Sequence, residues 1–179
     1  MIVEFVEIDS LDDIDFDYMF TESYTRMENT FLWPPMCVTY EQRKQFYYDQ
    51  LLAADNGTWP LKNETDTFIL IVTKVDGEIV EFTAGFRDEN DVVSLRWHLT
   101  APGADGKRNW RYSQEALQAR KDFVAQAGIK AFKEFTWKGS LHYRMLRMRA
   151  QTGNFILEEA PNTNSHPNHE LVEFTIRFP

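Results

Sequence analysis

The segment most informative about the fold runs from Val92 to Ile129 and reads VVSLRWHLTAPGADGKRNWRYSQEALQARKDFVAQAGI. Apolar and polar side chains alternate from Val92 to Thr100, which predicts a β-strand. The alternation places Val93, Leu95, Trp97 and Leu99 on one face and Ser94, Arg96, His98 and Thr100 on the other. A basic loop with glycines follows, and apolar residues then recur at helical spacing at Ala116, Leu117, Phe123, Val124 and Ala127. Ser113 before this helix and Gly128 after it are typical of helix ends. The stretch therefore predicts a strand, a basic loop and a helix, with another strand beginning at Ile129.

The same periodicities predict the elements on both sides of this stretch. Before it we expect a strand over Ile2–Ile8, a helix over Leu11–Met27, a helix from a capping box at Thr39 to a stop at Asn56, and strands over Thr67–Val75 and Ile79–Arg87. After it we expect a strand over Ile129–Trp137, a helix over Ser140–Gln151, and strands over Phe155–Glu158 and Leu171–Phe178. The fold class is therefore α/β in one domain over residues 1–179, with a mixed, mostly antiparallel central sheet of about seven strands flanked by about four helices. The element order is β-α-α-β-β-β-α-β-α-β-β.

Three segments carry more specific expectations. The helix over Ser140–Gln151 has an apolar face at Leu141, Met145 and Met148. The segment Phe31–Met36 contains paired prolines, so we expect a hydrophobic loop that serves as a protein interface or covers the open edge of the sheet. Ala160–His169 lacks any packing pattern and is expected to be a polar loop.

Composition excludes several classes of function. The formal net charge is -9, which argues against general binding to nucleic acid or to an anionic membrane surface. No apolar run approaches the roughly 18 residues that span a bilayer, and the single Cys37 excludes an internal disulfide, so we expect a cytoplasmic protein. His142, His166 and His169 lack the partners of a tetrahedral site, so no metal is expected.

The element order resembles the GNAT superfamily of acyl-CoA N-acyltransferases over the whole chain. The resemblance implies that Val92–Ile129 holds acetyl-CoA, with its diphosphate at the start of the following helix, where free amides and the helix dipole attract anions. The family motif is Gln or Arg, two residues, Gly, one residue, then Gly or Ala, and it aligns here with Arg108, Arg111 and Ser113. Cofactor contacts are then expected at Leu99, Thr100, Lys107, Arg108, Asn109, Trp110, Arg111, Tyr112 and Ser113.

The cofactor loop departs from the family motif. Arg111 replaces the first glycine and Ser113 the final small residue, so Trp110, Arg111 and Tyr112 hinder the approach of backbone amides to a phosphate. The side chains of Lys107, Arg108 and Arg111 offer positive charge that can replace those amides. The alternative is that these basic residues only solvate a loop of an acidic protein.

The catalytic residues are predicted from the chemistry of amine acylation, which requires a base near the end of the strand over Val92–Thr100. His98 is the candidate base, with Glu81 as a second choice and a hydrogen-bonded structural histidine as the alternative. The family usually places a tyrosine acid on the fourth helix, where this chain has Arg149. Tyr143, about two turns earlier, is the candidate acid.

Two functions remain open from the sequence. The first is an acetyl-CoA-dependent N-acetyltransferase that acts on a small-molecule amine or on a protein acceptor. The second is a catalytically inactive binding or structural module with the same fold. The acidic, aromatic-rich composition is also similar to small GNAT-like proteins encoded by bacteriophages, which implies a host cytoplasm or a virion as the setting. The sequence does not determine the oligomeric state.

Overall fold

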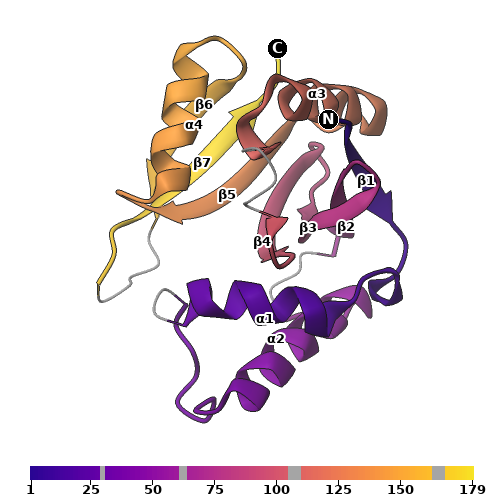
Figure 1. Ribbon diagram of the computed structural model, residues 1–179, viewed down its shortest axis with the longest axis vertical. Coiled ribbons are helices and arrows are strands. Elements are labelled where there is room, and N and C mark those ends of the chain that lie inside the picture. Colours follow the sequence, from indigo (N-terminus) through magenta and orange to yellow (C-terminus); the bar gives the residue numbers. More distant parts are fainter. Residues whose placement is uncertain (29–30, 61–63, 105–109, 163–167) are drawn as a thin grey trace.

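A computed structural model describes residues 1–28, 31–60, 64–104, 110–162 and 168–179. Within these residues, seven strands form one sheet in the order β1-β2-β3-β4-β5-β7-β6, with helices on both faces (Figure 1). The strands are β1 (Val3–Ile8), β2 (Thr67–Val75), β3 (Glu78–Arg87), β4 (Val92–Thr100), β5 (Ala131–Trp137), β6 (Ile156–Pro161) and β7 (Leu171–Arg177). The helices are α1 (Phe16–Met27), α2 (Tyr40–Asp55), α3 (Gln114–Ala127) and α4 (Leu141–Gln151), with short 3-10 turns η1 (Leu11–Asp13) and η3 (Trp110–Tyr112). The predicted fold class and element order are confirmed.

The sheet consists of two antiparallel groups joined by one short parallel contact. β1 to β4 form a meander, and β5, β7 and β6 form the second group. β4 and β5 run parallel, but their register pairs only Val92–Ser94 with Ala131–Lys133. Beyond Ser94 the two strands diverge (Figure 1). This divergence leaves space between the two groups of strands, and the candidate site lies there.

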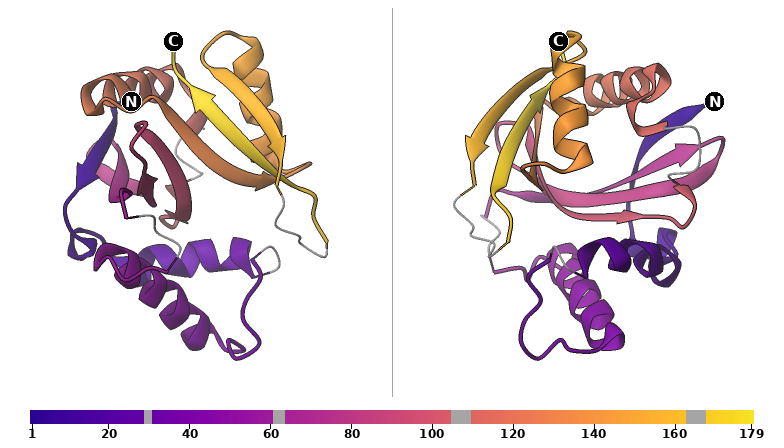
Figure 2. Two further views of the ribbon diagram at one scale, coloured as in Figure 1. Left: turned by 180° about the vertical axis from the view of Figure 1, so that it is seen from behind. Right: turned by 60° about the vertical axis from the view of Figure 1, so that its left-hand side comes forward.

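The helices cover the two faces of the sheet because alternate side chains of each strand point in opposite directions. On β2, Leu70 and Val72 belong to the apolar cluster that contains α1 and α2. Ile69 and Ile71 pack with α3 on the opposite face. α4 covers β7, where Tyr143 stacks on Phe174. Figure 2 shows α1 and α2 together on one side, away from α3 and α4.

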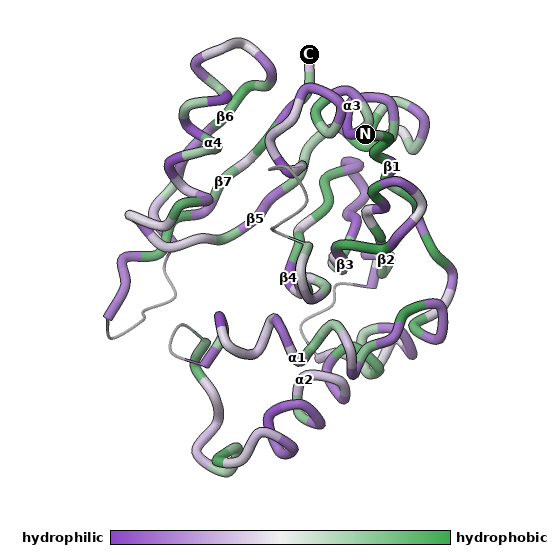
Figure 3. The backbone as a smooth tube through the Cα atoms, in the orientation of Figure 1, coloured by the Kyte–Doolittle hydropathy of each residue, from purple (hydrophilic) through white to green (hydrophobic). Residues whose placement is uncertain are grey.

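Most helix ends follow the signals in the sequence. Thr39 and Gln42 form the predicted capping box at the start of α2. Ser113 caps α3, and Gly128 ends that helix in a left-handed conformation. Figure 3 shows hydrophilic and hydrophobic residues alternating along α1 and α2, as expected for helices with one buried face.

The first predicted helix is wrong in its extent. The structure divides Leu11–Met27 into η1 and α1, because Ile14 is extended and closes the first turn. Asp15 then starts a new helix, since its carboxylate accepts a hydrogen bond from the Tyr18 amide. The cluster of acids in this segment therefore supplies a second N-cap that hydrophobic spacing alone did not reveal.

β4 contains a bulge that the alternation in the sequence did not reveal. Ala84 pairs with Trp97, but the next residue, Gly85, pairs with Leu95, so Arg96 is an extra residue in this register. A Cβ at Gly85 would lie 2.1 Å from the Ser94 carbonyl oxygen. Only glycine therefore fits opposite the bulge.

The bulge changes which side chains of β4 share a face, so the predicted grouping is wrong. Val93 and Leu95 pack with α3, whereas Trp97 and Leu99 pack with α1 and α2. The predicted grouping placed these four residues on one face. Because of the extra residue, His98 lies on the same face as Leu95, toward α3, where both line one cavity.

Three further expectations are corrected or refined. On α4 the buried residues are Tyr143 and Leu146, while Leu141 and Met148 are exposed, so the predicted apolar face is wrong. In the Phe31–Met36 loop, Phe31 and Trp33 pack on the main core, and the exposed apolar residues are Leu32 and Met36. β6 extends through Pro161 into the segment predicted to be a loop.

Candidate active site

A cavity of about 700 Å³ lies where β4 and β5 diverge. Its walls include side chains of β1, β3, β4, β5, η3, α3 and the start of α4. Polar lining residues include Glu81, His98, Arg111, Tyr112, Glu134 and His142. Aromatic side chains, among them Phe5, Phe123, Phe132 and Phe135, supply much of the remaining surface. The cavity therefore combines an apolar body with a few convergent polar groups, as is typical of small-molecule sites.

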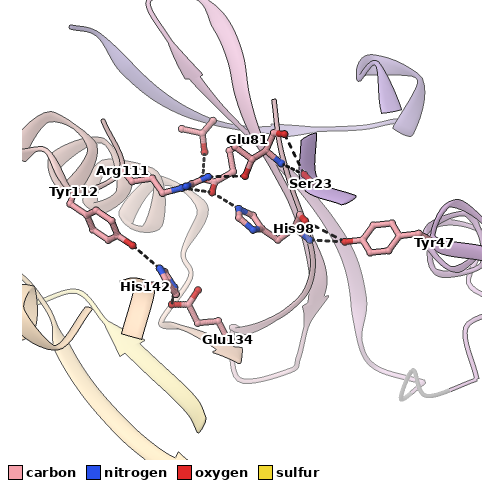
Figure 4. Close-up of polar contacts among 10 residues, drawn as sticks. Ser23, Tyr47, Glu81, His98, Arg111, Tyr112, Glu134 and His142 are labelled. Atoms are coloured by element: carbon pink, nitrogen blue, oxygen red, sulfur yellow. Dashed lines mark hydrogen bonds and ion pairs between the residues drawn. The ribbon is translucent and has the colours of Figure 1, made fainter. Parts of the chain in front are cut away.

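The first polar cluster joins β3, β4 and η3. Glu81 is buried, and its Oε1 contacts His98 Nε2 and accepts a hydrogen bond from Arg111 Nε at 3.0 Å (Figure 4). Thr73 Oγ1 donates to Glu81 Oε2 at 3.3 Å. Arg111 also donates through Nη2 to Thr100 Oγ1 at 2.8 Å. Glu81 is therefore the centre of the cluster and fixes the orientation of the histidine and the arginine.

The charge of Glu81 determines the state of the His98 ring. Burial raises the pKa of Glu81, but the Arg111 guanidinium and His98 outweigh it and hold this pKa well below its ordinary value of 4.5. An ionised carboxylate can only accept hydrogen bonds, so His98 Nε2 carries the proton. The lone pair of a neutral His98 is then on Nδ1, on a side chain that is half exposed at the cavity.

The second polar cluster joins η3, α4 and β5. The Tyr112 hydroxyl lies 2.8 Å from His142 Nδ1, and His142 Nε2 lies 3.1 Å from Glu134 Oε1 (Figure 4). Burial raises the pKa of Glu134, but His142 and Arg120 together lower this pKa by more than burial raises it, so the carboxylate is ionised. Burial raises the pKa of Tyr112 to about 12, so its hydroxyl is neutral. With a neutral His142, Tyr112 donates to Nδ1 and Nε2 donates to Glu134; with a protonated ring, Nδ1 donates to the Tyr112 oxygen instead.

Side chains of α1 and α2 form hydrogen bonds with backbone groups of β4 beside the cavity. Tyr47 Oη accepts from the His98 amide at 3.0 Å and donates to the His98 carbonyl at 3.4 Å (Figure 4). Ser23 Oγ likewise accepts from the Thr100 amide at 2.7 Å and donates to its carbonyl at 3.3 Å. These hydroxyls satisfy groups that a neighbouring strand would otherwise bind. β5 can therefore diverge without leaving these groups of β4 unpaired.

The structure brings some of the predicted site residues to the cavity and not others. His98, Trp110, Arg111 and Tyr112 line it, although the Trp110 ring is almost fully buried. Lys107, Arg108 and Asn109 lie outside the described residues. Leu99 packs in the main core, Thr100 is bonded to Ser23 and Arg111, and Ser113 caps α3.

Tyr143, the candidate acid, is placed away from the cavity lining. It is buried on α4 against Phe174, and its hydroxyl contacts Arg147 at 2.8 Å and Glu159 at 3.4 Å. The structure therefore does not bring Tyr143 together with His98. Arg149, which stands at the position of the family's tyrosine, donates a hydrogen bond to the Tyr112 carbonyl.

Sequence reasoning missed Glu134, His142, Ser23 and Tyr47 as site residues. Glu134 carried a signal, because a period of two places it on the same face of its strand as the apolar Phe132. A charged residue on an apolar strand face often has a specific partner. Ser23 and Tyr47 carried no such signal, because their roles depend on how α1 and α2 dock on β4.

The charges of the cavity are opposite to that of the whole chain. The net charge is -9, yet the described lining contains the arginines Arg26, Arg96, Arg111 and Arg120 against the acids Glu81 and Glu134. Arg120 lies 5.0 Å from the centre of the Phe5 ring and lowers the pKa of both acids. The cavity thus attracts an anionic ligand into an acidic protein.

Comparison with known proteins gives the fold but no close relative. No family model matches the sequence, and no curated protein sequence matches it either. Among solved structures, the ribosomal L7/L12 alpha-N-protein acetyltransferase RimL in complex with coenzyme A superposes with a TM-score of 0.57 at 12% identity, over 99% of this chain and 94% of that one. A putative acetyltransferase of the GNAT family from Desulfovibrio desulfuricans gives 0.51 at 13% identity, over 98% of each chain. A variant of the spermidine N-acetyltransferase SpeG from Vibrio cholerae gives 0.52 at 7% identity, over 98% of this chain and 93% of that one.

The chain has the GNAT fold. The RimL match covers 99% of this chain, so it spans the elements that line the cavity. Within the described residues, no helix of this GNAT fold has the length and apolarity needed to cross a membrane. Those residues also contain no group of three or more histidine, cysteine, aspartate or glutamate side chains that could hold a metal ion.

Proposed function

We propose that this chain is an N-acyltransferase that uses acetyl-CoA and takes the proton of its amine acceptor on His98. The observation that carries the proposal is the buried, ionised Glu81 that orients His98 at the wall of a 700 Å³ cavity where β4 and β5 diverge. A histidine held by a carboxylate presents its other nitrogen as a base. The GNAT fold supports the proposal, since structures of acetyltransferases share it.

The residues present fit an acyl-CoA thioester. Arg120 and the other arginines of the cavity offer cations to the phosphate groups, and the phenylalanine rings offer an apolar surface to the acyl end. The start of α3, capped by Ser113, adds the positive end of a helix dipole. Tyr47 and Ser23 already form hydrogen bonds with the backbone of β4. In this proposal, side chains of the cavity therefore hold the cofactor arm.

The chemistry of the transfer follows from this arrangement. A bound acetyl-CoA supplies an acetyl group activated as a thioester. His98 Nδ1 accepts a proton from the acceptor's nitrogen, whose lone pair then forms the new bond to the acyl carbon as the carbon–sulfur bond breaks. Glu81 stays ionised throughout, because Arg111 holds its charge, and stabilises the imidazolium that forms. The aromatic walls exclude water, which would otherwise compete with the amine.

The acceptor is an amine that reaches His98. The structures of similar fold span an enzyme of protein N-termini and an enzyme of spermidine, so this fold accommodates both kinds of amine. The proposal therefore includes both kinds of acceptor expected from the sequence, a small-molecule amine and a protein.

Titration calorimetry with acetyl-CoA, followed by a coupled assay of free thiol with a panel of amines, tests the function. We expect saturable binding, and transfer that an Arg120→Ala variant weakens through KM because one cavity cation is lost. Arg144→Ala is the matched control, since this exposed arginine of α4 does not line the cavity. An absence of detectable binding at millimolar acetyl-CoA would overturn the proposal.

One observation favours the inactive module instead. The β4 edge is closed by Tyr47 and Ser23, and Arg111 is committed to Glu81 and Thr100. A binding module with this fold would retain these contacts as core structure and use its surface to bind a partner. Absence of acetyl-CoA binding would favour this second function, for which the phage-related setting stays a prediction.

A further inference from the structure

We propose that Tyr112, His142 and Glu134 form a proton relay that delivers a proton to the leaving sulfur during acyl transfer. The inference rests on the proposed function and adds a second proton-handling group to the cavity of His98. Tyr112 is the catalytic residue of the relay, because its side chain lines the cavity. His142 and Glu134 are positioning residues that act through it.

The geometry of the relay is continuous from the cavity to the half-exposed His142 ring. The Tyr112 hydroxyl lies 2.8 Å from His142 Nδ1, and the opposite ring nitrogen lies 3.1 Å from Glu134 Oε1. All three side chains line the same cavity as His98. They come from three different elements, η3, α4 and β5, so the arrangement requires the tertiary fold and is not a local contact.

Helix α4 contacts Tyr112 at two places, the side-chain hydroxyl and the backbone carbonyl. His142, on the first turn of α4, contacts the hydroxyl, and Arg149, on its last turn, donates to the backbone carbonyl of Tyr112. Arg149 is therefore tied to Tyr112 through the backbone. A tyrosine held at two points has little freedom to leave its position, which is the requirement for a group that transfers a proton.

The proton balance of the relay closes without any further reactant. In the proposed step His142 enters as the imidazolium, with Nε2–H on Glu134 and Nδ1–H donated to the Tyr112 oxygen. As the carbon–sulfur bond breaks, the Tyr112 O–H proton goes to the thiolate sulfur and the Nδ1 proton of His142 replaces it. The ring becomes neutral and regains a proton from solvent, because its side chain is 39% exposed. The proton of the amine goes separately to His98.

Charged groups on η3, α3, β3 and β5 act on the Tyr112 hydroxyl. Arg111 on η3 and Arg120 on α3 favour the tyrosinate, while Glu134 on β5 and Glu81 on β3 oppose it. His98 on β4 also acts on Glu134. The two proton-handling groups are thus electrostatically coupled, so protonation of His98 affects the relay.

The experiment compares two thioesters of different leaving groups in the full chain. With acetyl-CoA, whose alkyl thiolate needs a proton, Tyr112→Phe should lower kcat about a hundredfold. With the acetyl thioester of para-nitrothiophenol, whose thiolate is stable without a proton, the same variant should retain the wild-type rate. Tyr18→Phe, which removes an exposed hydroxyl of α1, is the control and should change neither rate.

The readout without any thioester is the titration of His142 by nuclear magnetic resonance. Tyr112→Phe and Glu134→Gln should each shift the His142 titration, whereas Tyr18→Phe should not. If Tyr112→Phe loses activity equally with both thioesters, or not at all, the relay is overturned while the proposed function stands. A wild-type chain without transferase activity overturns both, and an unshifted His142 titration overturns the relay by itself.

Discussion

Two histidine–glutamate pairs line one cavity, and they differ in their third partner. Glu81, with a side chain only 8% exposed, holds His98 and is bound by Arg111 at 3.0 Å. Glu134, 21% exposed, holds His142, whose other nitrogen meets the Tyr112 hydroxyl. The same two residue types therefore stand in two different electrostatic settings within a single site.

The third partner determines what each pair can do. A guanidinium keeps Glu81 ionised and leaves His98 Nδ1 free to take a proton. A tyrosine hydroxyl fills His142 Nδ1, so this ring passes protons on rather than taking them from a ligand. A histidine beside a carboxylate is therefore not by itself a general base, because its role depends on what its other ring nitrogen contacts.

The largest expected difference between the two pairs is in the effect of removing each histidine. We expect His98→Ala to lower kcat for acetyl transfer about a thousandfold, because the amine then loses its proton only to solvent. His142→Ala should lower kcat about tenfold, since Tyr112 keeps its own proton. Steady-state assays from neutral to alkaline pH measure both, and the loss in His98→Ala should shrink as the amine deprotonates by itself. Equal losses in the two variants would contradict the assigned roles.

The two carboxylates should also differ in how much each contributes to the stability of the fold. Glu81→Gln should lower the free energy of unfolding by about 3 kcal/mol, because it leaves the mostly buried Arg111 without its counter-ion. Glu134→Gln should cost about 1 kcal/mol, since its partner His142 is more exposed to solvent. Urea unfolding at neutral pH measures both values. A smaller loss in Glu81→Gln than in Glu134→Gln would contradict the ranking.

The contribution of Glu81 to the free energy of unfolding should also depend on pH. The folded pKa of Glu81 lies below its ordinary value of 4.5, so its stabilising effect is fully present above that pH. It is lost as the pH falls below 4.5 and through the folded pKa. The stability difference between wild type and Glu81→Gln should therefore decrease as the solution becomes more acidic than pH 4.5.

Local signals predicted the fold and only half of the candidate site. The capping box at Thr39 and the stop at Gly128 are local, so the sequence predicted those element ends. His98 was predicted because it lies near the end of a recognisable strand. The bulge at Arg96 was not predicted, because it depends on the close approach of Gly85 to a neighbouring strand.

The missed half of the site arises from contacts between elements distant in the sequence. Tyr112 and His142 are 30 residues apart, and no spacing rule connects a 3-10 turn to a later helix. Arg149 was recognised only as the residue in place of an expected tyrosine. Its hydrogen bond to the Tyr112 carbonyl gives it a structural role that motif alignment does not reveal.

The smallest expected effect concerns the β4 backbone beside both pairs. Ser23→Ala should cost about 1 kcal/mol, because the buried amide and carbonyl of Thr100 lose their hydroxyl partner. Thr21→Ala, an exposed hydroxyl on the same helix, is the control and should cost less. Because side chains of the cavity hold the cofactor arm in the proposed function, the acetyl-CoA Kd from calorimetry should be unchanged in Ser23→Ala. A tighter Kd would mean that the hydroxyl competes with the cofactor for the β4 edge, and that the strand itself is part of the binding site.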